Sequence, residues 1–362
     1  MEARNKLTLL IDGNWLLMSR MSVLVKKFDK ANPAWAKEEA SVEFKELLAK
    51  SINIILWQFK CIDNIIFIAD GGSWRKKLAI PDTLKETTYK GNRSKAVEID
   101  WDYIYKPFNE LFEHCKSLGI TCSRYTDCEG DDLVWYWSRR LNSEGVNCII
   151  WSSDNDLKQL VQYDADHNTF TAWYNNKNGL FLSNDLDQRS TDPLDFFLTP
   201  QICIGSLEEL KQICYGTIEY IDPDMIAIDK IFRGDSGDNI KSVVLYKKGN
   251  KVYKLSQRQY DDIIDKFNIT SARDIGAKVD SISQYIPTIK SLTQYHLSPH
   301  DIHDMLEYNI KLVWLNESAI PDAIIATMNQ GEYKSFPVDD IRSNYTILLG
   351  ENSYIKDIFE TL

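Results

Sequence analysis

Three short apolar runs, each ending in an acidic residue, constrain the fold of this chain more than any other feature. They are "KLTLLID" (6–12), "NIIFIAD" (64–70) and "GVNCIIWSSD" (145–154). Runs this short and this apolar are typical of strands buried on both faces of a parallel sheet. Between the first two, residues 41–60 place apolar side chains at helical spacing. Strands that alternate with helices predict an α/β fold with a mainly parallel central sheet flanked by helices.

The acids that end these runs are expected to lie near one another. Asp12, Asp70 and Asp154 each follow a predicted strand directly. The carboxyl ends of parallel strands meet at one edge of a sheet, and open α/β sheets bind their ligands there. Three segments that are far apart in the sequence therefore bring carboxylates to the same edge.

The rest of the chain divides into regions of different character. Residues 168–183 have the pattern of a β-hairpin with its turn at 175–179. Residues 71–106 are basic and aromatic, although the whole chain has 53 acidic against 42 basic residues. Beyond about residue 240 the pattern becomes helical. We therefore expect one domain over residues 1–240 and a helical region over residues 241–362.

Further acids stand in "EGDDL" (129–133), "SSDND" (152–156) and "GDSGDN" (234–239). With the strand-end acids they form a set of nine: Asp12, Asp70, Glu129, Asp131, Asp132, Asp154, Asp156, Asp235 and Asp238. Carboxylates without Cys or His favour a hard cation, Mg²⁺ or Mn²⁺, over zinc. Taking these nine charges out of the net charge of −11 leaves −2, so the acidity does not exclude a polyanionic substrate. A pair of divalent ions can activate water and stabilise both oxygens exchanged at a phosphodiester.

The composition disfavours several other classes of protein. The seven cysteines include no C-x-x-C pair, which argues against a zinc site or a disulfide framework and favours reduced, cytosolic thiols. None of the five histidines lies in an acidic segment, so a histidine-based hydrolase is disfavoured. Asp12 interrupts the first apolar run, unlike a signal peptide, and no stretch of 18 apolar residues predicts a membrane span.

Five motifs in order resemble one known family. They are "LLIDGNWLLMSR" (9–20), "YKGNRSK" (89–95), "EGDDL", "WSSDNDLKQLV" (151–161) and "GDSGDNIKSV" (234–243). In sequence and spacing they are similar to the flap-endonuclease and 5′→3′ exonuclease superfamily, most of all to its ribonuclease H group from T-even bacteriophages. The resemblance covers roughly residues 7–330 and implies a PIN/5′-nuclease-like sheet, a helical arch over about residues 71–106, and a helical C-terminal region that binds duplex DNA.

The resemblance also implies a set of site residues. Two Mg²⁺ ions, for which Mn²⁺ can substitute, would be held by Asp12, Asp70, Glu129, Asp131 and Asp132 together with Asp154, Asp156, Asp235 and Asp238. Lys90 and Arg93 would act on the scissile phosphate. Contacts to nucleic acid would come from Arg75, Lys76, Lys77, Lys90, Arg93, Lys95, Lys247, Lys248 and Lys251.

The activity implied is that of a Mg²⁺-dependent 5′→3′ exonuclease and flap endonuclease on DNA–DNA and RNA–DNA duplexes. Its role would be to remove RNA primers from lagging-strand fragments in phage DNA replication. The expected substrates are DNA with a 5′ end or flap and RNA–DNA hybrids. The expected protein is a cytoplasmic monomer, with a single-strand-binding protein and a sliding clamp as possible helpers and no membrane partner.

Other interpretations of the same residues stay open. A PIN-type RNA endonuclease shares the strand-end acids, and a non-catalytic DNA-binding protein could retain the fold. "EGDDL" alone could be a capped helix start, and Asp127 beside it is expected to be solvated. Trp74 and Tyr89 could stack on bases or pack inside the protein. The family's glycine-rich hairpin is replaced here by residues 242–254, residues 186–224 have no assigned role, and the C-terminal "SYIKDIFETL" could be a clamp-binding peptide.

Overall fold

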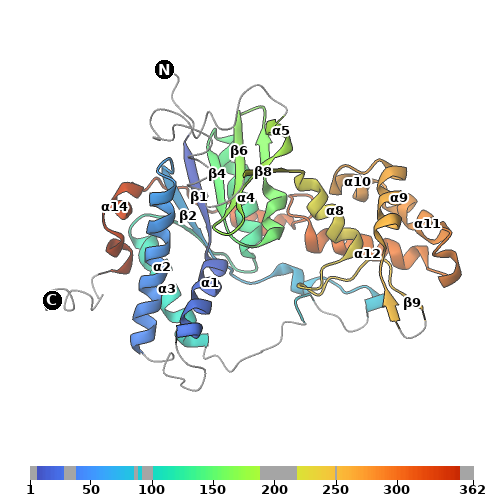
Figure 1. The fold of residues 1–362 in the computed structure, drawn as a ribbon, viewed down its shortest axis with the longest axis horizontal. Helices are drawn as coiled ribbons and strands as arrows, with labels where there is room; N and C mark the ends of the chain where they lie inside the picture. Colours follow the sequence, from blue (N-terminus) through green and yellow to red (C-terminus); the bar gives the residue numbers. More distant parts are fainter. Residues whose placement is uncertain are drawn as a thin grey trace. The chain divides into compact units, whose positions relative to one another are not determined.

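The computed structural model describes residues 6–27, 38–84, 89–91, 101–187, 218–248 and 251–350 (Figure 1). The chain divides into two units, and each is assembled from more than one stretch of sequence. Unit 1 comprises residues 1–72, 97–221 and 327–362, and unit 2 comprises residues 73–96 and 222–326. The boundary expected near residue 240 falls inside unit 2, and the roles expected for the ranges on either side of it stay predictions.

Unit 1 is built on a sheet with the strand order β3-β2-β1-β4-β6-β7-β8, in which β5 also pairs with β6. The pairs β1–β2, β1–β4, β2–β3, β4–β6 and β7–β8 are parallel, and only β6 pairs antiparallel, with β5 and β7. The mainly parallel sheet is therefore confirmed. Its strands are β1 (Leu7–Asp12), β2 (Asn64–Ile68), β3 (Thr121–Ser123), β4 (Asn147–Trp151), β5 (Gln162–Asp164), β6 (Thr169–Asn175), β7 (Gly179–Ser183) and β8 (Ile218–Ile221).

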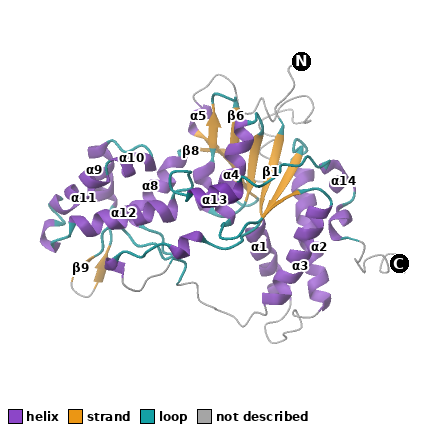
Figure 2. Ribbon diagram, turned by 180° about the vertical axis from the view of Figure 1, so that it is seen from behind, coloured by secondary structure: helices purple, strands orange, loops and turns teal. Residues whose placement is uncertain are grey.

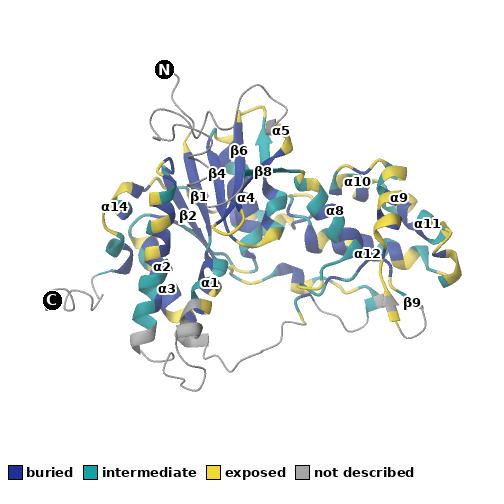
Figure 3. Ribbon diagram, viewed as in Figure 1, coloured by how far each residue is buried: buried dark blue, intermediate teal, exposed yellow. Residues whose placement is uncertain are grey.

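Helices cover both faces of this sheet. Leu7, Leu9 and Ile11 of β1 join a hydrophobic cluster with α2 and α3, which lie side by side (Figure 2). The alternate residues of β1 are buried too, because α4 packs against β1, β4 and β6 on the other face. The central strands are accordingly buried throughout (Figure 3). The helices of unit 1 in this part of the chain are α1 (Gly13–Lys27), α2 (Glu38–Gln58), α3 (Trp101–Ser117), α4 (Gly130–Ser143), the 3₁₀ helix η4 (Asn155–Leu160) and α5 (Asn184–Asp187).

The last part of the described chain returns to unit 1. α14 (Val338–Ser343) and the 3₁₀ helix η7 (Tyr345–Leu349) pack against α2. Arg342 donates hydrogen bonds to the carbonyl oxygens of Leu56, Phe59, Lys60 and Ile62, at 2.9, 3.3, 3.1 and 2.8 Å. The carbonyls at the end of a helix have no partner within it, so this guanidinium caps α2 from a distant part of the sequence.

Unit 2 has its own hydrophobic core, to which Tyr89 contributes alongside residues 227–313. It contains the 3₁₀ helices η2 (Trp74–Lys77), η3 (Asp82–Leu84), η5 (Ile286–Thr288) and η6 (Thr293–Tyr295), and the antiparallel strands β9 (Tyr246–Lys248) and β10 (Lys251–Tyr253). Its other helices are α8 (Pro223–Arg233), α9 (Gln257–Phe267), α10 (Ala272–Ala277), α11 (Val279–Tyr285) and α12 (Pro299–Val313), and α13 (Asp322–Met328) leads back to unit 1.

Several sequence predictions can be compared directly with these elements. The three apolar runs are β1, β2 and β4, the helical spacing at 41–60 falls in α2, and residues 168–183 form the β6–β7 hairpin. Of the expected helical arch, residues 85–88 and 92–100 lie outside the described residues, as do most of residues 186–224 and the C-terminal "SYIKDIFETL". Among the described helices, none has the length and apolar character needed to cross a membrane.

Candidate active site

Asp12 stands at the junction between β1 and α1, where it caps the helix. Its Oδ1 accepts a hydrogen bond from the backbone N–H of Trp15 at 2.9 Å, and its Oδ2 accepts one from Ser152 Oγ at 2.6 Å. Burial raises the pKa of Asp12 to about 6, the two hydrogen bonds act against this rise, and the charges of Asp154 and Asp70 add to it. The carboxylates of Asp154 and Asp70 therefore both lie close enough to Asp12 to act on its charge.

Asp70 follows β2 and is held by two neighbours. Asn14 Nδ2 donates to its Oδ2 at 2.5 Å, and the backbone N–H of Gly130 donates to its Oδ1 at 2.5 Å. Gly130 is the first residue of α4, so Asp70 lies at the positive end of that helix dipole. A Cβ at residue 130 would lie 2.9 Å from Asp70 Oδ1, which explains the glycine in "EGDD".

The loop that carries the acidic cluster pairs with the loop after β2. Gly71 N–H donates to the carbonyl of Cys128 at 2.9 Å, and Asp127 N–H donates to that of Gly71 at 3.2 Å. A Cβ on Gly71 would lie 1.9 Å from the carbonyl oxygen of Tyr125, so only glycine allows this approach. The two loops are thereby fixed together at the carboxyl edge of the sheet.

The three acids of "EGDDL" lie at the start of α4, and two of them are buried. The backbone N–H of Glu129 donates to Asp132 Oδ2 at 3.3 Å, so Asp132 serves as a cap for its own helix. Asp132 is fully buried and Glu129 is 5% exposed, whereas Asp131 is half-buried. The capping interpretation therefore describes Asp132 in this conformation, and metal ligation by these three acids stays a prediction.

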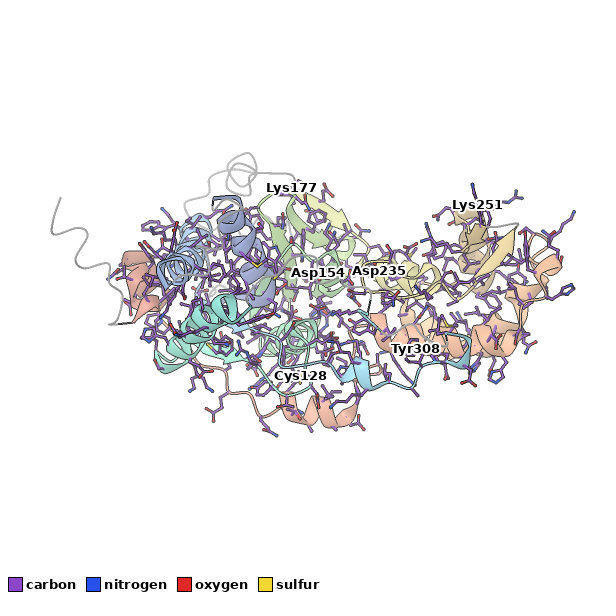
Figure 4. The ribbon with its side chains drawn as sticks, turned by 90° about the horizontal axis from the view of Figure 1, so that it is seen from below. Cys128, Asp154, Lys177, Asp235, Lys251 and Tyr308 are labelled. Atoms are coloured by element: carbon purple, nitrogen blue, oxygen red, sulfur yellow. The ribbon has the colours of Figure 1, made fainter. Side chains whose placement is uncertain are left out.

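Asp154 follows β4 and caps η4, because its Oδ1 accepts from the backbone N–H of Asp156 at 2.9 Å (Figure 4). Its own N–H donates to Ser152 Oγ at 3.0 Å, so Ser152 links Asp154 to Asp12. Asp154 is exposed and Asp156 is half-buried.

The chemistry of this donor set suits a hard divalent cation, since every side chain offered is a carboxylate. Within the described ranges, however, no three His, Cys, Asp or Glu side chains are gathered closely enough to hold an ion in this conformation. Mg²⁺ usually keeps several waters and takes only one or two carboxylates directly, so it does not need a closed protein cage. The residues of unit 1 fit such an ion through their chemistry and shared edge.

The second acidic pair lies in unit 2, in the turn after α8. Lys230 Nζ donates to Asp235 Oδ2 at 2.5 Å, and Gly237 N–H donates to Asp235 Oδ1 at 2.7 Å. Burial alone would raise the pKa of Asp235, but the hydrogen bond and charge of Lys230 outweigh it and lower that pKa. Asp235 therefore carries its negative charge opposite a lysine that the sequence analysis did not single out.

Lys90 and Tyr89 approach the other member of this pair. Lys90 N–H donates to the carbonyl of Asp238 at 2.8 Å, and Lys90 Nζ lies 3.9 Å from Asp238 Oδ2. Tyr89 Oη donates to the same carboxylate at 3.5 Å and is 7% exposed. The packing interpretation of Tyr89 is thus the one the structure favours, and unit 2 joins the motifs "YKGNR" and "GDSGDN".

The predicted nucleic-acid contacts differ in exposure. Lys76, Lys77 and Lys251 are exposed. Arg75 is 2% exposed with its guanidinium 4.5 Å from the ring centre of Trp74, itself buried, so both pack inside the protein in this conformation. Arg93, Lys95 and the side chains of Lys247 and Lys248 lie outside the described part of the chain. Binding by any of these residues stays a prediction.

Four residues near these acids escaped the sequence analysis. Asn14 and Ser152 position Asp70 and Asp12, Gly130 donates to Asp70, and Lys230 pairs with Asp235. The first three stand inside the quoted motifs "DGN", "SSD" and "EGDD", so proximity to the acids was a usable signal. Lys230 lies five residues before its partner, and no helical spacing rule indicates that contact.

The chain was compared with known proteins. A family model described as "5'-3' exonuclease, N-terminal resolvase-like domain" matches residues 7–187. A 5'-3' exonuclease of Mycoplasmopsis pulmonis is 25% identical over 272 residues, which cover 73% of this chain and 71% of that protein. The ribonuclease H of Enterobacteria phage T4 is 29% identical over 166 residues, covering 42% of this chain and 48% of the phage protein.

A solved structure of the T5 5'-exonuclease with bound zinc ions has a TM-score of 0.50 and 18% sequence identity, and the match covers 95% of this chain and 99% of that one. At this identity the likeness concerns the fold alone. The family model spans half of the chain, and its description is that of a nuclease domain. The chain belongs to the 5'-3' exonuclease family, within the flap-endonuclease superfamily.

Proposed function

We propose that the chain is a Mg²⁺-dependent 5′→3′ exonuclease and flap endonuclease that acts on DNA with a 5′ end or flap and on RNA–DNA hybrids. The observation that carries the proposal is the shared edge of unit 1. There the charges of Asp70 and Asp154, which follow two other strands, act on Asp12 at the end of β1. Membership of a nuclease family supports phosphodiester hydrolysis as the chemistry of that edge.

Each carboxylate has a defined task in this proposal. Asp12, Asp70, Glu129, Asp131 and Asp132 would be the first group of ligands, binding the ions directly or through water. Asp154, Asp156, Asp235 and Asp238 would be the second group. Two bound Mg²⁺ ions would supply water activation and stabilisation of the leaving 3′ oxygen. Asn14, Ser152 and the Gly130 N–H orient the carboxylates of Asp70 and Asp12 through hydrogen bonds.

Cationic side chains would position the substrate. Lys90 and Arg93 would stabilise charge on the scissile phosphate. Lys76, Lys77, Lys95, Lys247, Lys248 and Lys251, with Arg75 if it becomes exposed, would contact phosphates along the strands. Such contacts fix the register of a nucleic acid without specifying its sequence.

The proposed biological role is the removal of RNA primers from lagging-strand fragments during phage DNA replication. Its support is the similarity to the phage ribonuclease H over 166 residues, a partial match. We further propose that the enzyme works as a monomer, assisted by a single-strand-binding protein and a sliding clamp.

A cleavage assay on labelled 5′-flap substrates, with RNA and DNA 5′ strands side by side, tests the proposed function. Cleavage should require Mg²⁺, and Asp154→Asn should abolish it while binding of the substrate stays largely intact. Asp127→Asn is the matched control, because Asp127 has a φ of 64° that asparagine tolerates, and it should cleave normally. Full activity of Asp154→Asn would refute the metal site, and cleavage of single-stranded RNA alone would favour a PIN-type RNA endonuclease instead.

A further inference from the structure

A pocket of about 270 Å³ opens in unit 1 beside β3, the edge strand of the sheet. Its walls come from the end of α3, from β3, from α4 and from residues 330–334. Lys334 N–H donates to Thr121 Oγ1 at 2.8 Å, which closes the pocket at the amino end of β3. None of the nine predicted metal ligands lines this pocket, although the charge of Asp70 acts on Arg124 at one side of it.

The floor and one wall of the pocket are aromatic. Trp137 lines it and is fully buried, and its Nε1 has no hydrogen-bond acceptor. Phe112 and Tyr125 line it as well, and the guanidinium of Arg124 lies 4.3 Å from the ring centre of Phe112. Buried polar groups in proteins are nearly always paired, so an unused indole N–H beside a pocket indicates room for a ligand acceptor.

Three cations converge on the same pocket. Lys116 and Lys334 are exposed, and within the described chain neither has a carboxylate oxygen within 4.0 Å. Burial raises the pKa of the Cys122 thiol to about 12, and the charge of Glu113 adds to this rise, whereas the charges of Lys116, Arg124 and Lys334 act against it. All three cations therefore lie near Cys122 in the wall of the pocket, and neither lysine forms an ion pair within the described chain.

Two acidic side chains also line the pocket and add hydrogen-bond acceptors to it. Glu113 and Glu332 line it without an ion pair to either lysine. A ligand that suits all of these groups has an anionic end for the cations, a flat ring for the aromatic wall, and hydroxyl or amino donors for the carboxylates. The volume is just below the roughly 300–1,000 Å³ of drug-sized ligand sites, which limits the ligand to a small molecule.

We propose that this pocket binds a single nucleotide unit, with its phosphate among Lys116, Arg124 and Lys334, its base against Tyr125, and an acceptor atom of that base on the indole N–H of Trp137. The choice of a nucleotide among ring-bearing anions rests on the proposed function, because a 5′→3′ exonuclease releases such units. Phosphate recognition by a planar guanidinium together with lysines is a common arrangement in proteins. The unit is either a free 5′-mononucleotide or the terminal residue of a strand.

Calorimetric titration of the whole protein in EDTA tests the proposal without any cleavage step. The probes are a 5′-mononucleotide, the matching nucleoside, inorganic phosphate, and a short oligonucleotide with a 5′-phosphate. The variant Lys116→Ala/Lys334→Ala should weaken mononucleotide binding by about tenfold or more for each lysine removed. Lys177→Ala is the matched control, because Lys177 is exposed in the β6–β7 turn far from these residues in sequence (Figure 4), and it should bind normally.

Each result decides between outcomes. Tighter binding of the mononucleotide than of phosphate or nucleoside, lost in the double variant only, supports the proposal, and the oligonucleotide shows whether a strand end is preferred. Equal binding of inorganic phosphate, no binding at millimolar concentration, or equal effects of the two variants would overturn it. Mononucleotide binding by a protein without nuclease activity would support the pocket proposal and refute the proposed function. Cleavage without mononucleotide binding would support the proposed function and refute the pocket proposal.

Discussion

The negative charge on Asp12 lowers the stability of the metal-free protein. The magnitude of this loss follows from the pKa of the carboxyl. The pKa of this carboxyl rises from 3.8 to about 6, chiefly through burial. A rise of roughly two units corresponds to about 3 kcal/mol between the two protonation states. The pKa of Asp12 in the folded state lies above its pKa in the unfolded state. The protonated carboxyl therefore makes its full contribution to the free energy of unfolding below about pH 4, and this contribution is lost as pH rises through about 6.

Asp12→Asn removes that charge and keeps the shape of the side chain. The amide oxygen can still accept from the N–H of Trp15, and the hydroxyl of Ser152 can accept from the new amide nitrogen. At pH 7.5 in EDTA the variant should therefore be more stable than the wild type, by up to about 3 kcal/mol. The difference should shrink as pH falls from 6 towards 4, where the wild-type carboxyl is protonated.

Urea unfolding at pH 7.5 and pH 4.5, with and without Mg²⁺, measures this difference. Mg²⁺ should stabilise the wild type at pH 7.5, since an ion that binds only the folded state shifts the equilibrium towards it. The same ion should stabilise Asp12→Asn much less, and Asp127→Asn should behave as the wild type. A variant no more stable than the wild type in EDTA at pH 7.5 would refute the claim that burial strains this charge.

Three further predictions follow from other contacts. Gly130→Ala should lower cleavage at least tenfold with little change in melting temperature, because its Cβ would crowd Asp70 Oδ1; full activity would show that this contact is dispensable. Arg342→Ala should reduce the free energy of unfolding of unit 1 by about 2–4 kcal/mol, because α2 loses its cap. Asp339→Asn is the control: Asp339 pairs with Arg342 but is 85% exposed, so thermal unfolding should show little change in stability. Binding of a flap substrate should weaken with a slope near −0.9 in log–log salt titrations for each phosphate contacted, and a flat response would exclude an electrostatic groove.

The sequence predicted the carboxylate edge because the signal was strong and local. Short, fully apolar runs can only be buried strands, and the position of Asp12, Asp70 and Asp154 at their ends follows from the parallel arrangement. The β6–β7 hairpin was predictable for the same reason, since its turn residues are adjacent in sequence. These features depend on short stretches of chain.

Contacts between distant segments were not predictable in this way. Arg342 caps a helix that ends 284 residues earlier, at Gln58, and no pattern near either residue indicates the pairing. The burial of Arg75 is a second example, because this residue was expected to contact nucleic acid. In both cases a charged side chain satisfies backbone or aromatic groups that only the assembled fold brings to it.

The order of the chain also sets an order of assembly during synthesis. Residues 222–326 leave the ribosome before the segment that carries Arg342 and before Tyr333, whose hydroxyl lies 3.0 Å from Thr8 Oγ1 at the start of β1. Domains tend to fold as their residues emerge, so unit 2 has all of its residues available while the sheet of unit 1 still lacks its closing contacts. A nascent chain should therefore leave the start of β1 and the end of α2 without these contacts until the segment that carries Tyr333 and Arg342 has been translated.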